Sequence, residues 1–261
     1  MIEHYADHCI NHPPQAYFHQ KKFILSMCIG IPTTFNNTAS KEKITNDKIK
    51  ILHAPSKAGP KGSSIFRKII NELIDEKYPI EYKEVSNVPN SEVLKLISEC
   101  DFVLDELYSD TPMAVFASEA ASLGKPAVVG GYYSKIMTHD IPSRYLPPSC
   151  FVLPENIKEA IVRLITDKEY RINLGINAKR FVTENWAAEK VAQKYMDIIA
   201  GITPGDWFYD PYNIDYLYGV GLSEENAKKN IRVVLNKGGI EYVCRTAKPE
   251  HEKKMKEFAY E

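Results

Sequence analysis

The chain has 261 residues, of which 44% are apolar and 26% charged, and its 33 basic and 34 acidic residues leave a net charge of −1. This length is enough for one large domain or two modest ones with a proper core. The opposite charges nearly cancel and are interspersed, which argues against a nucleic-acid partner, because binding to a polyanion needs an excess of basic residues.

The cysteines and the apolar runs indicate the compartment. The five cysteines are far apart and lack the spacing of a metal or redox motif. They favour a reducing environment, with Cys100 and Cys150 as small core residues. No apolar run reaches the roughly 20 residues of a membrane span, and the first residues are unlike a signal peptide. We therefore expect a cytoplasmic protein without a membrane span.

The first part of the chain predicts little regular structure. An apolar run predicts a strand over residues 23–29, and Gly30 and Pro32 follow it. The polar stretch over residues 33–47 has the composition of a linker.

From residue 47 to residue 200, short apolar runs alternate with segments of helical periodicity. Strands are predicted over residues 49–54, 80–85, 102–105, 127–129 and 150–153. Helices are predicted from a cap at Ser63 or Ser64, from residue 91, and over residues 114–123, 157–166, 168–184 and 191–199. This alternation predicts an α/β fold, a doubly wound parallel sheet with helices on both faces. Ligands of such sheets bind beyond the carboxyl ends of the strands, at the topological switch point.

Residues 201–261 begin with an aromatic, turn-rich stretch and end in a charged helix. The aromatic residues are Trp207, Phe208, Tyr209, Tyr212, Tyr216 and Tyr218. They either pack onto the chain's own domain or cover a surface that binds a partner.

The most informative segment covers residues 111–130. A loop opens a helix that carries Glu119, and Gly124, Lys125 and Pro126 then lead into an apolar strand. Free N–H groups at a helix start attract anions, and a carboxylate one or two turns further on can accept hydrogen bonds from sugar hydroxyls. The segment therefore predicts a nucleotide-sugar site.

Several landmarks occur along the chain in an order that is typical of one family. They are residues 6–10 and 22–32, residues 51–56, Lys61 with Gly62, Val88 with Pro89, residues 101–104, the Glu119 segment and residues 181–186. With these landmarks the chain resembles the carboxyl-terminal, donor-binding domain of a GT-B glycosyltransferase of the retaining family-4 type, also called group 1. The resemblance implies a Rossmann-like fold, a nucleotide-diphosphate sugar as donor, and transfer without a metal or another cofactor. It divides the chain into the end of an acceptor domain with a linker (1–46), a nucleotide-sugar-binding domain (47–200) and an extension (201–261).

The resemblance also assigns roles at the nucleotide end of the site. Lys61, beside Gly62 and ahead of a helix, would contact the diphosphate, and Lys57 is a second candidate cation. Val88 matches the place where the base is held, and Glu119 would hold the ribose hydroxyls. The alternatives are solvated loop lysines, a plain turn at Val88, and a glutamate that favours the helix dipole.

The sugar end of the site departs from the family pattern. The family carries a second acid eight residues before the ribose-binding glutamate, where this chain has Thr111, with Asp110 beside it. Asp110, Thr111 or the backbone N–H groups of the loop formed by Met113, Ala114 and Val115 are the candidates for binding the sugar. Ala114 tolerates a close approach of the backbone less well than the family's glycine does.

Other motifs have simpler interpretations. His53 is expected to be a satisfied core histidine, and the irregular spacing of the histidines before residue 20 does not predict a metal site. Gly130 and Gly131, after the fourth strand, are expected to let the chain pass near the donor.

A whole GT-B enzyme has an acceptor domain ahead of the linker, and residues 1–46 are too few to form one. Three functions are therefore open. The chain is the donor half of a glycosyltransferase in glycan or surface-polysaccharide synthesis, a nucleotide-sugar-binding or partner subunit without turnover, or a sugar-nucleotide epimerase of GT-B-like fold. The expected partner is a separate acceptor-domain chain, or a second copy that binds through the aromatic region after residue 201.

Overall fold

The computed structural model of the chain describes residues 2–17, 19–25, 30–32, 48–59, 61–217, 219, 221–242 and 249–261. The predicted strand over residues 23–29 is described only as far as β2 (Phe23–Leu25). The predicted linker over residues 33–47 and the aromatic residue Tyr218 lie outside the described residues.

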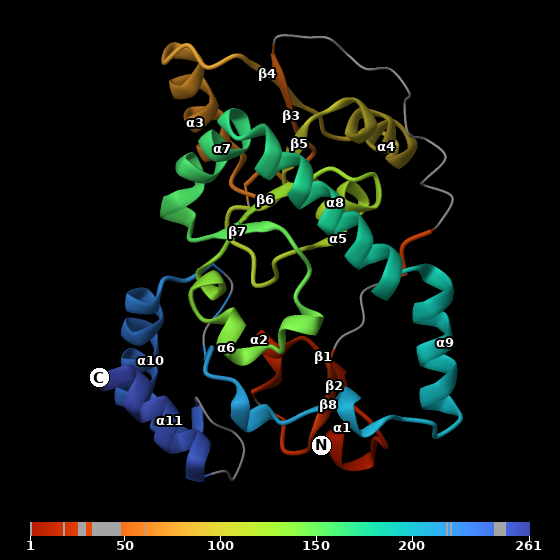
Figure 1. The fold of residues 1–261 in the computed structure, drawn as a ribbon. Helices are drawn as coiled ribbons and strands as arrows, with labels where there is room; N and C mark the ends of the chain where they lie inside the picture. Colours follow the sequence, from red (N-terminus) through yellow and green to blue (C-terminus); the bar gives the residue numbers. More distant parts are fainter. Residues whose placement is uncertain are drawn as a thin grey trace.

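The main sheet has five parallel strands in the order β4-β3-β5-β6-β7 (Figure 1). They are β3 (Ile49–His53), β4 (Ile80–Glu84), β5 (Phe102–Leu104), β6 (Ala127–Gly130) and β7 (Cys150–Val152). The register pairs Ile51 of β3 with Tyr82 on one side and with Phe102 on the other. These are the five strands that the sequence predicted, in the predicted parallel arrangement.

Helices cover both faces of this sheet, as the doubly wound α/β prediction requires. They are α3 (Ser63–Asp75), α4 (Asn90–Glu99), α5 (Val115–Ser122), α7 (Ile157–Thr166) and α8 (Lys168–Asn185), and α9 (Ala188–Ile199) follows α8. Apolar residues of α3 and α7 pack on one face, and those of α4, α5 and α8 pack on the other.

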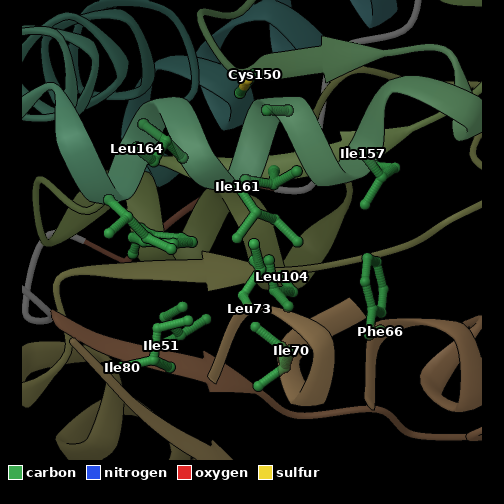
Figure 2. Packing of buried hydrophobic residues seen from close by; sticks show 14 of the residues in the cluster. Ile51, Phe66, Ile70, Leu73, Ile80, Leu104, Cys150, Ile157, Ile161 and Leu164 are labelled. Atoms are coloured by element: carbon green, nitrogen blue, oxygen red, sulfur yellow. The ribbon is translucent and has the colours of Figure 1, made fainter. Parts of the chain in front are cut away.

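The two faces explain why the central strands β5 and β6 are apolar without a break. Ile51 faces the core under α3 and α7, whereas its neighbour Leu52 faces the core under α4, α5 and α8. Figure 2 shows the first of these cores, where Phe66 and Ile161 come from the two covering helices. Because both faces of β5 and β6 are buried, consecutive residues, which point to opposite faces, are all apolar there.

A second, smaller sheet joins the two ends of the chain. Its strands are β1 (Ile10–Asn11), β2 (Phe23–Leu25) and β8 (Phe208–Tyr209), in the order β1-β2-β8. β1 pairs with β2 in parallel, and β8 pairs with β2 in the antiparallel direction. In Figure 1 this sheet lies below the main sheet, and α9 leads toward it. The sequence did not predict this sheet.

The small sheet has its own apolar core. Buried Phe23 and Leu25 pack with Tyr133, Ile214 and Tyr216, and the rings of Tyr133 and Tyr216 lie 4.4 Å apart between their centroids. Much of the aromatic stretch after residue 201 therefore packs onto its own chain. The sequence had left this alternative open.

Short helices complete the described chain. They are α1 (Ile2–Tyr5), α2 (Pro13–Ala16), η2 (Tyr132–Lys135), α6 (Met137–Asp140), η3 (Ser143–Tyr145), η4 (Pro154–Asn156), η5 (Gly205–Trp207), η6 (Pro211–Asn213) and η7 (Ile240–Tyr242). The last part contains α10 (Glu224–Gly238) and α11 (Pro249–Tyr260), which pack against each other. Among the described helices, none is long and apolar enough to cross a bilayer.

Candidate functional site

The order of the main sheet reverses between β3 and β5, which makes this edge the topological switch point. The chain leaves β3 for α3 on one face of the sheet and leaves β5 for α5 on the other face. The described loop residues 54–59, 61–62 and 105–114 therefore flank the crevice at the carboxyl edge, where ligands of such sheets bind.

Gly62 brings these two loops into contact. It is the N-cap of α3 and has a left-handed backbone with a φ of 75°. A Cβ atom at Gly62 would lie 2.5 Å from the Cβ of Leu107, and the N–H of Leu107 donates to the carbonyl of Lys61 over 3.2 Å. Only glycine suits both the backbone angle and the close approach.

The predicted serine cap of α3 is wrong, because Ser63 has another partner. Its hydroxyl lies 2.7 Å from Nε2 of His53. The other ring nitrogen, Nδ1, lies 2.7 Å from the carbonyl oxygen of Leu104. A carbonyl can only accept, so Nδ1 carries the proton and Ser63 donates to Nε2. His53 is fully buried, as expected of a core histidine, and burial lowers its pKa.

Lys61 is held by two acids of the facing loop. Its ammonium lies 3.0 Å from Oδ1 of Asp105 and also forms an ion pair with Glu106. Burial alone would lower the pKa of Lys61, but the two carboxylates outweigh burial and raise it. A diphosphate at this edge would therefore compete with two carboxylates for Lys61.

Asp105 is the more deeply buried of the two acids. Its side chain has no exposed surface, and among the described residues Oδ2 has no hydrogen-bond partner. Burial raises the pKa of Asp105, and the charge of Lys61 opposes that rise. The sequence analysis did not identify Asp105 and Glu106, although two acids directly after a buried strand were a visible signal.

Glu119 and the loop around Val88 come together at the same edge. Glu119 is half-buried on α5, and the side-chain amide of Asn90 donates to its Oε1 over 2.9 Å. Asn90 begins α4 directly after Val88 and Pro89, and burial raises the pKa of Glu119. The structure thus places Glu119, the residue that the sequence assigned to the ribose, against the start of α4, two residues after Val88. It adds Asn90, which the sequence analysis missed.

The start of α5 lies beside this group. Ala114 is its N-cap and offers no side chain to cap the helix, while its carbonyl accepts from the N–H of Ser118 over 2.9 Å. Met113 is buried, whereas Val115 is 54% exposed. An anion beside this helix start would meet the N–H groups of the first turn.

Asp110 and Thr111, the candidates at the sugar end, are held by different partners. The hydroxyl of Tyr216 donates to Oδ1 of Asp110 over 3.2 Å. The hydroxyl of Ser109 donates to the carbonyl of Thr111 over 2.8 Å and accepts from its N–H. Asp110 is therefore tied to the segment after β8, which the sequence did not connect with the site.

A pocket lies between the small sheet and the loop that precedes α5. Its cavity volume is about 80 Å³, and Asp110, Thr111 and Met113 form part of its wall. Its lining includes neither Lys61 nor Glu119. The predicted residues therefore form two groups, one at the switch point and one at this pocket.

The remaining predicted residues have peripheral or structural positions. Lys57 is exposed in the loop after β3. A Cβ atom added at Gly130 would lie 2.4 Å from the carbonyl oxygen of Leu107, and one added at Gly131 would lie 2.0 Å from the carbonyl oxygen of Ser109. These two glycines thus make room for the loop that contains Asp105 and Asp110.

Two groups of side chains in the described part of the chain could each offer three ligand atoms to a metal. One is Glu3, Cys9 and His19, and the other is His139, Asp140 and Asp215. Glu3 also accepts from the backbone N–H groups of Gln20 and Lys21, and Asp140 from those of Asp215 and Tyr216. Neither group includes a residue of the loops at the switch point. The expectation of a metal-independent site stays a prediction.

No known protein family and no curated protein matches this sequence. Solved structures of similar fold include sucrose-phosphate synthase from Thermosynechococcus elongatus, which is 16% identical over 67% of this chain and 52% of that chain, with a TM-score of 0.41. Anabaena HepE in complex with UDP-glucose is 13% identical over 66% of this chain and 56% of that one, with a TM-score of 0.47. A variant of S. aureus TarM in a complex that contains UDP is 9% identical over 69% and 40%, with a TM-score of 0.49. The chain spans about half the length of these structures, or less, and its likeness to them is one of overall α/β architecture.

Proposed function

We propose that this chain binds a nucleotide-diphosphate sugar at the carboxyl edge of its main sheet and transfers the sugar to an acceptor hydroxyl, as the donor half of a GT-B-type glycosyltransferase. The observation that carries the proposal is the hydrogen bond from Asn90, which follows Val88 and Pro89 at the start of α4, to Glu119. The Glu119 carboxylate can accept from both hydroxyls of a ribose, and Asn90 fixes its orientation. Backbone groups around Val88 would then meet the base.

The diphosphate would lie between this group and the sugar end. The N–H groups at the start of α5 and the ammonium of Lys61 would stabilise the charge of the leaving diphosphate. Lys61 would exchange a carboxylate of Asp105 or Glu106 for a phosphate oxygen. Asp110, Thr111 or the backbone of residues 113–115 would bind the sugar.

Titration calorimetry with UDP-, GDP- and ADP-glucose tests this proposal. We expect one of these donors to bind, and Glu119→Gln to weaken it at least about tenfold, or ~1.4 kcal/mol, because the neutral amide accepts ribose hydrogen bonds less well. The matched control is Glu92→Gln, an exposed glutamate in the first turn of α4. No binding of any donor, or equal binding by Glu119→Gln and wild type, would overturn the proposal.

A second candidate function is binding of the nucleotide sugar without turnover. The ion pairs of Lys61 with Asp105 and Glu106 favour it, since two carboxylates at the diphosphate position oppose the charge that develops as the leaving group departs. Release of radiolabelled sugar from a bound donor, to water or to an added acceptor, separates the two candidates. Binding with no release under any condition would favour the binding subunit.

A further inference from the structure

Lys61 has two possible partners at the switch point. Among the described residues it is the one ion-pair partner of Asp105, whose Oδ1 lies 3.0 Å from the ammonium. It is also the cation proposed for the diphosphate. The side chain of Lys61 is partly exposed, whereas that of Asp105 has no exposed surface. A ligand at this edge of the sheet can therefore reach Lys61 but not Asp105.

The surroundings of Asp105 compensate its charge poorly once Lys61 is removed. Oδ2 has no hydrogen-bond partner among the described residues. Burial raises the pKa of Asp105, Lys61 opposes that rise, and the like charge of Glu106 adds to it. The other group that favours the charged form is the backbone N–H of Ala117 on α5. A buried carboxylate that loses its counter-charge binds a proton, because the neutral form costs much less to bury.

A diphosphate at this edge would weaken the remaining compensation in two ways. It attracts the ammonium of Lys61 away from Asp105, since one cation cannot neutralise both groups. Its own negative charges also repel the carboxylate, and this repulsion is stronger in a buried site than in water. Both effects favour the neutral form of Asp105.

We propose that binding of the nucleotide sugar is coupled to the uptake of a proton by Asp105. This inference rests on the proposed function and adds a control of the same site by pH. In the free protein the ion pair keeps Asp105 ionised. In the complex Lys61 binds a phosphate oxygen, and the carboxyl group of Asp105 carries a proton taken from solvent. The affinity for the donor therefore increases as the pH falls, by at most about tenfold per pH unit.

Two other titratable side chains near Lys61 are weaker candidates for the proton. Glu106 pairs with Lys61 from a partly exposed position, so water can solvate its charge after Lys61 leaves. His53 is fully buried, and burial and, to a lesser degree, the charge of Lys61 lower its pKa. Its two hydrogen bonds need the neutral ring, however, and they do not involve Lys61. Asp105 is therefore the group that the departure of Lys61 destabilises most.

Calorimetry of the full chain with UDP-, GDP- and ADP-glucose in HEPES and in Tris at one neutral pH counts the protons, because the buffer that supplies a proton adds its own ionisation enthalpy to the heat. Nucleotide sugars have no group that titrates near neutral pH. We expect wild type to take up about half a proton or more per donor bound. Asp105→Asn should take up none and bind with an affinity that no longer depends on pH. The matched controls Glu106→Gln and His53→Gln should keep the uptake.

Infrared difference spectra of wild type give a second measurement, which holds even if Asp105→Asn does not fold. The C=O band of a protonated carboxyl group should appear when the donor binds. Donor binding with equal heats in the two buffers, or proton uptake that persists in Asp105→Asn or disappears in Glu106→Gln, would overturn the coupling and leave the proposed function standing. If no donor binds, the proposed function fails and the coupling fails with it.

Discussion

The ion pair between Asp105 and Lys61 stabilises the charge of the buried Asp105 more than it stabilises the charge of Lys61. The Asp105 carboxylate is fully buried and one of its oxygens has no hydrogen-bond partner among the described residues, whereas the Lys61 side chain keeps 18% of its surface exposed. An uncompensated charge in such a place costs much more than a released surface lysine.

We therefore expect Lys61→Met to lower the free energy of unfolding by about 3 kcal/mol, because it leaves Asp105 buried without a counter-charge. The pKa of Asp105 is already raised by burial and should rise further in this variant. Urea unfolding of Lys61→Met and of the double variant Lys61→Met/Asp105→Asn measures the coupling. If the double variant recovers none of the lost stability, Asp105 is not the cause.

Glu106 offers a test that bears on binding. It pairs with Lys61 from a partly exposed position, so Glu106→Gln should release Lys61 without leaving a buried charge. If Lys61 contacts the diphosphate, the dissociation constant of the nucleotide sugar should fall about threefold to tenfold at low salt, and less at high salt because salt screens the competing charge. Calorimetry against Glu241→Gln, an exposed glutamate in η7, is the comparison. An unchanged or weaker affinity would contradict competition between Glu106 and the phosphate.

At the scale of elements, His53 joins three of them. It belongs to β3, accepts from Ser63 of α3 and donates to the carbonyl of Leu104 at the end of β5. These bonds need the neutral ring, because only the neutral ring can accept at Nε2. The junction of the three elements thus depends on the protonation of one side chain.

Because burial lowers the pKa of His53, an unfolded chain binds a proton near pH 6.5 that the folded chain does not bind. The contribution of His53 to stability is therefore complete above pH 6.5 and is lost as the pH falls below it, with a slope of at most about 1.4 kcal/mol per pH unit. In urea unfolding between pH 5 and 8, His53→Gln should show a shallower loss on the acidic side than wild type. The exposed His4→Gln should behave as wild type. If the free energy of unfolding of His53→Gln and that of wild type fell equally with pH, this role of His53 would be excluded.

The central elements could be predicted because their signals are local. β3, β5 and β6 are short apolar runs, and α3 repeats Phe66, Ile70 and Leu73 at helical spacing, so burial on both faces is visible in the sequence. β1 and β8 could not be predicted, since each has two residues and exists only through pairing with β2. The switch point shows the same contrast. The carboxylate of Glu119 could be recognised from its own segment of the sequence. Its bond to Asn90 and the ion pairs of Lys61 depend on loops that the fold brings together.

At the scale of the whole molecule, the small sheet ties the described residues up to Leu25 to the segment after residue 201. Tyr216 is its central contact, fully buried against Tyr133 and bonded to Asp110. Its N–H also donates to Asp140 of α6. One residue therefore connects the small sheet, α6 and the pocket wall.

Tyr216→Ala should lower the free energy of unfolding by about 3 kcal/mol or more, because it removes a fully packed aromatic ring. Hydrogen exchange should become faster in β2 and α6, while β3 and β5 of the main sheet keep their protection. Tyr212→Ala, at a residue that is 39% exposed, is the control. Equal acceleration of exchange in both sheets would show that they unfold as one unit.

The pairing of β2 with β8 also sets an order of events during synthesis on the ribosome. Phe23 pairs with Tyr209, and all five strands of the main sheet are translated between them. The strands of that sheet have nearer partners in sequence, and contacts between distant segments form late because closing a long loop costs entropy. The nascent chain must therefore carry three apolar residues, Phe23, Ile24 and Leu25, without their final partner until the aromatic segment emerges. During that interval β2 is an open strand edge that chaperones or other nascent chains could bind.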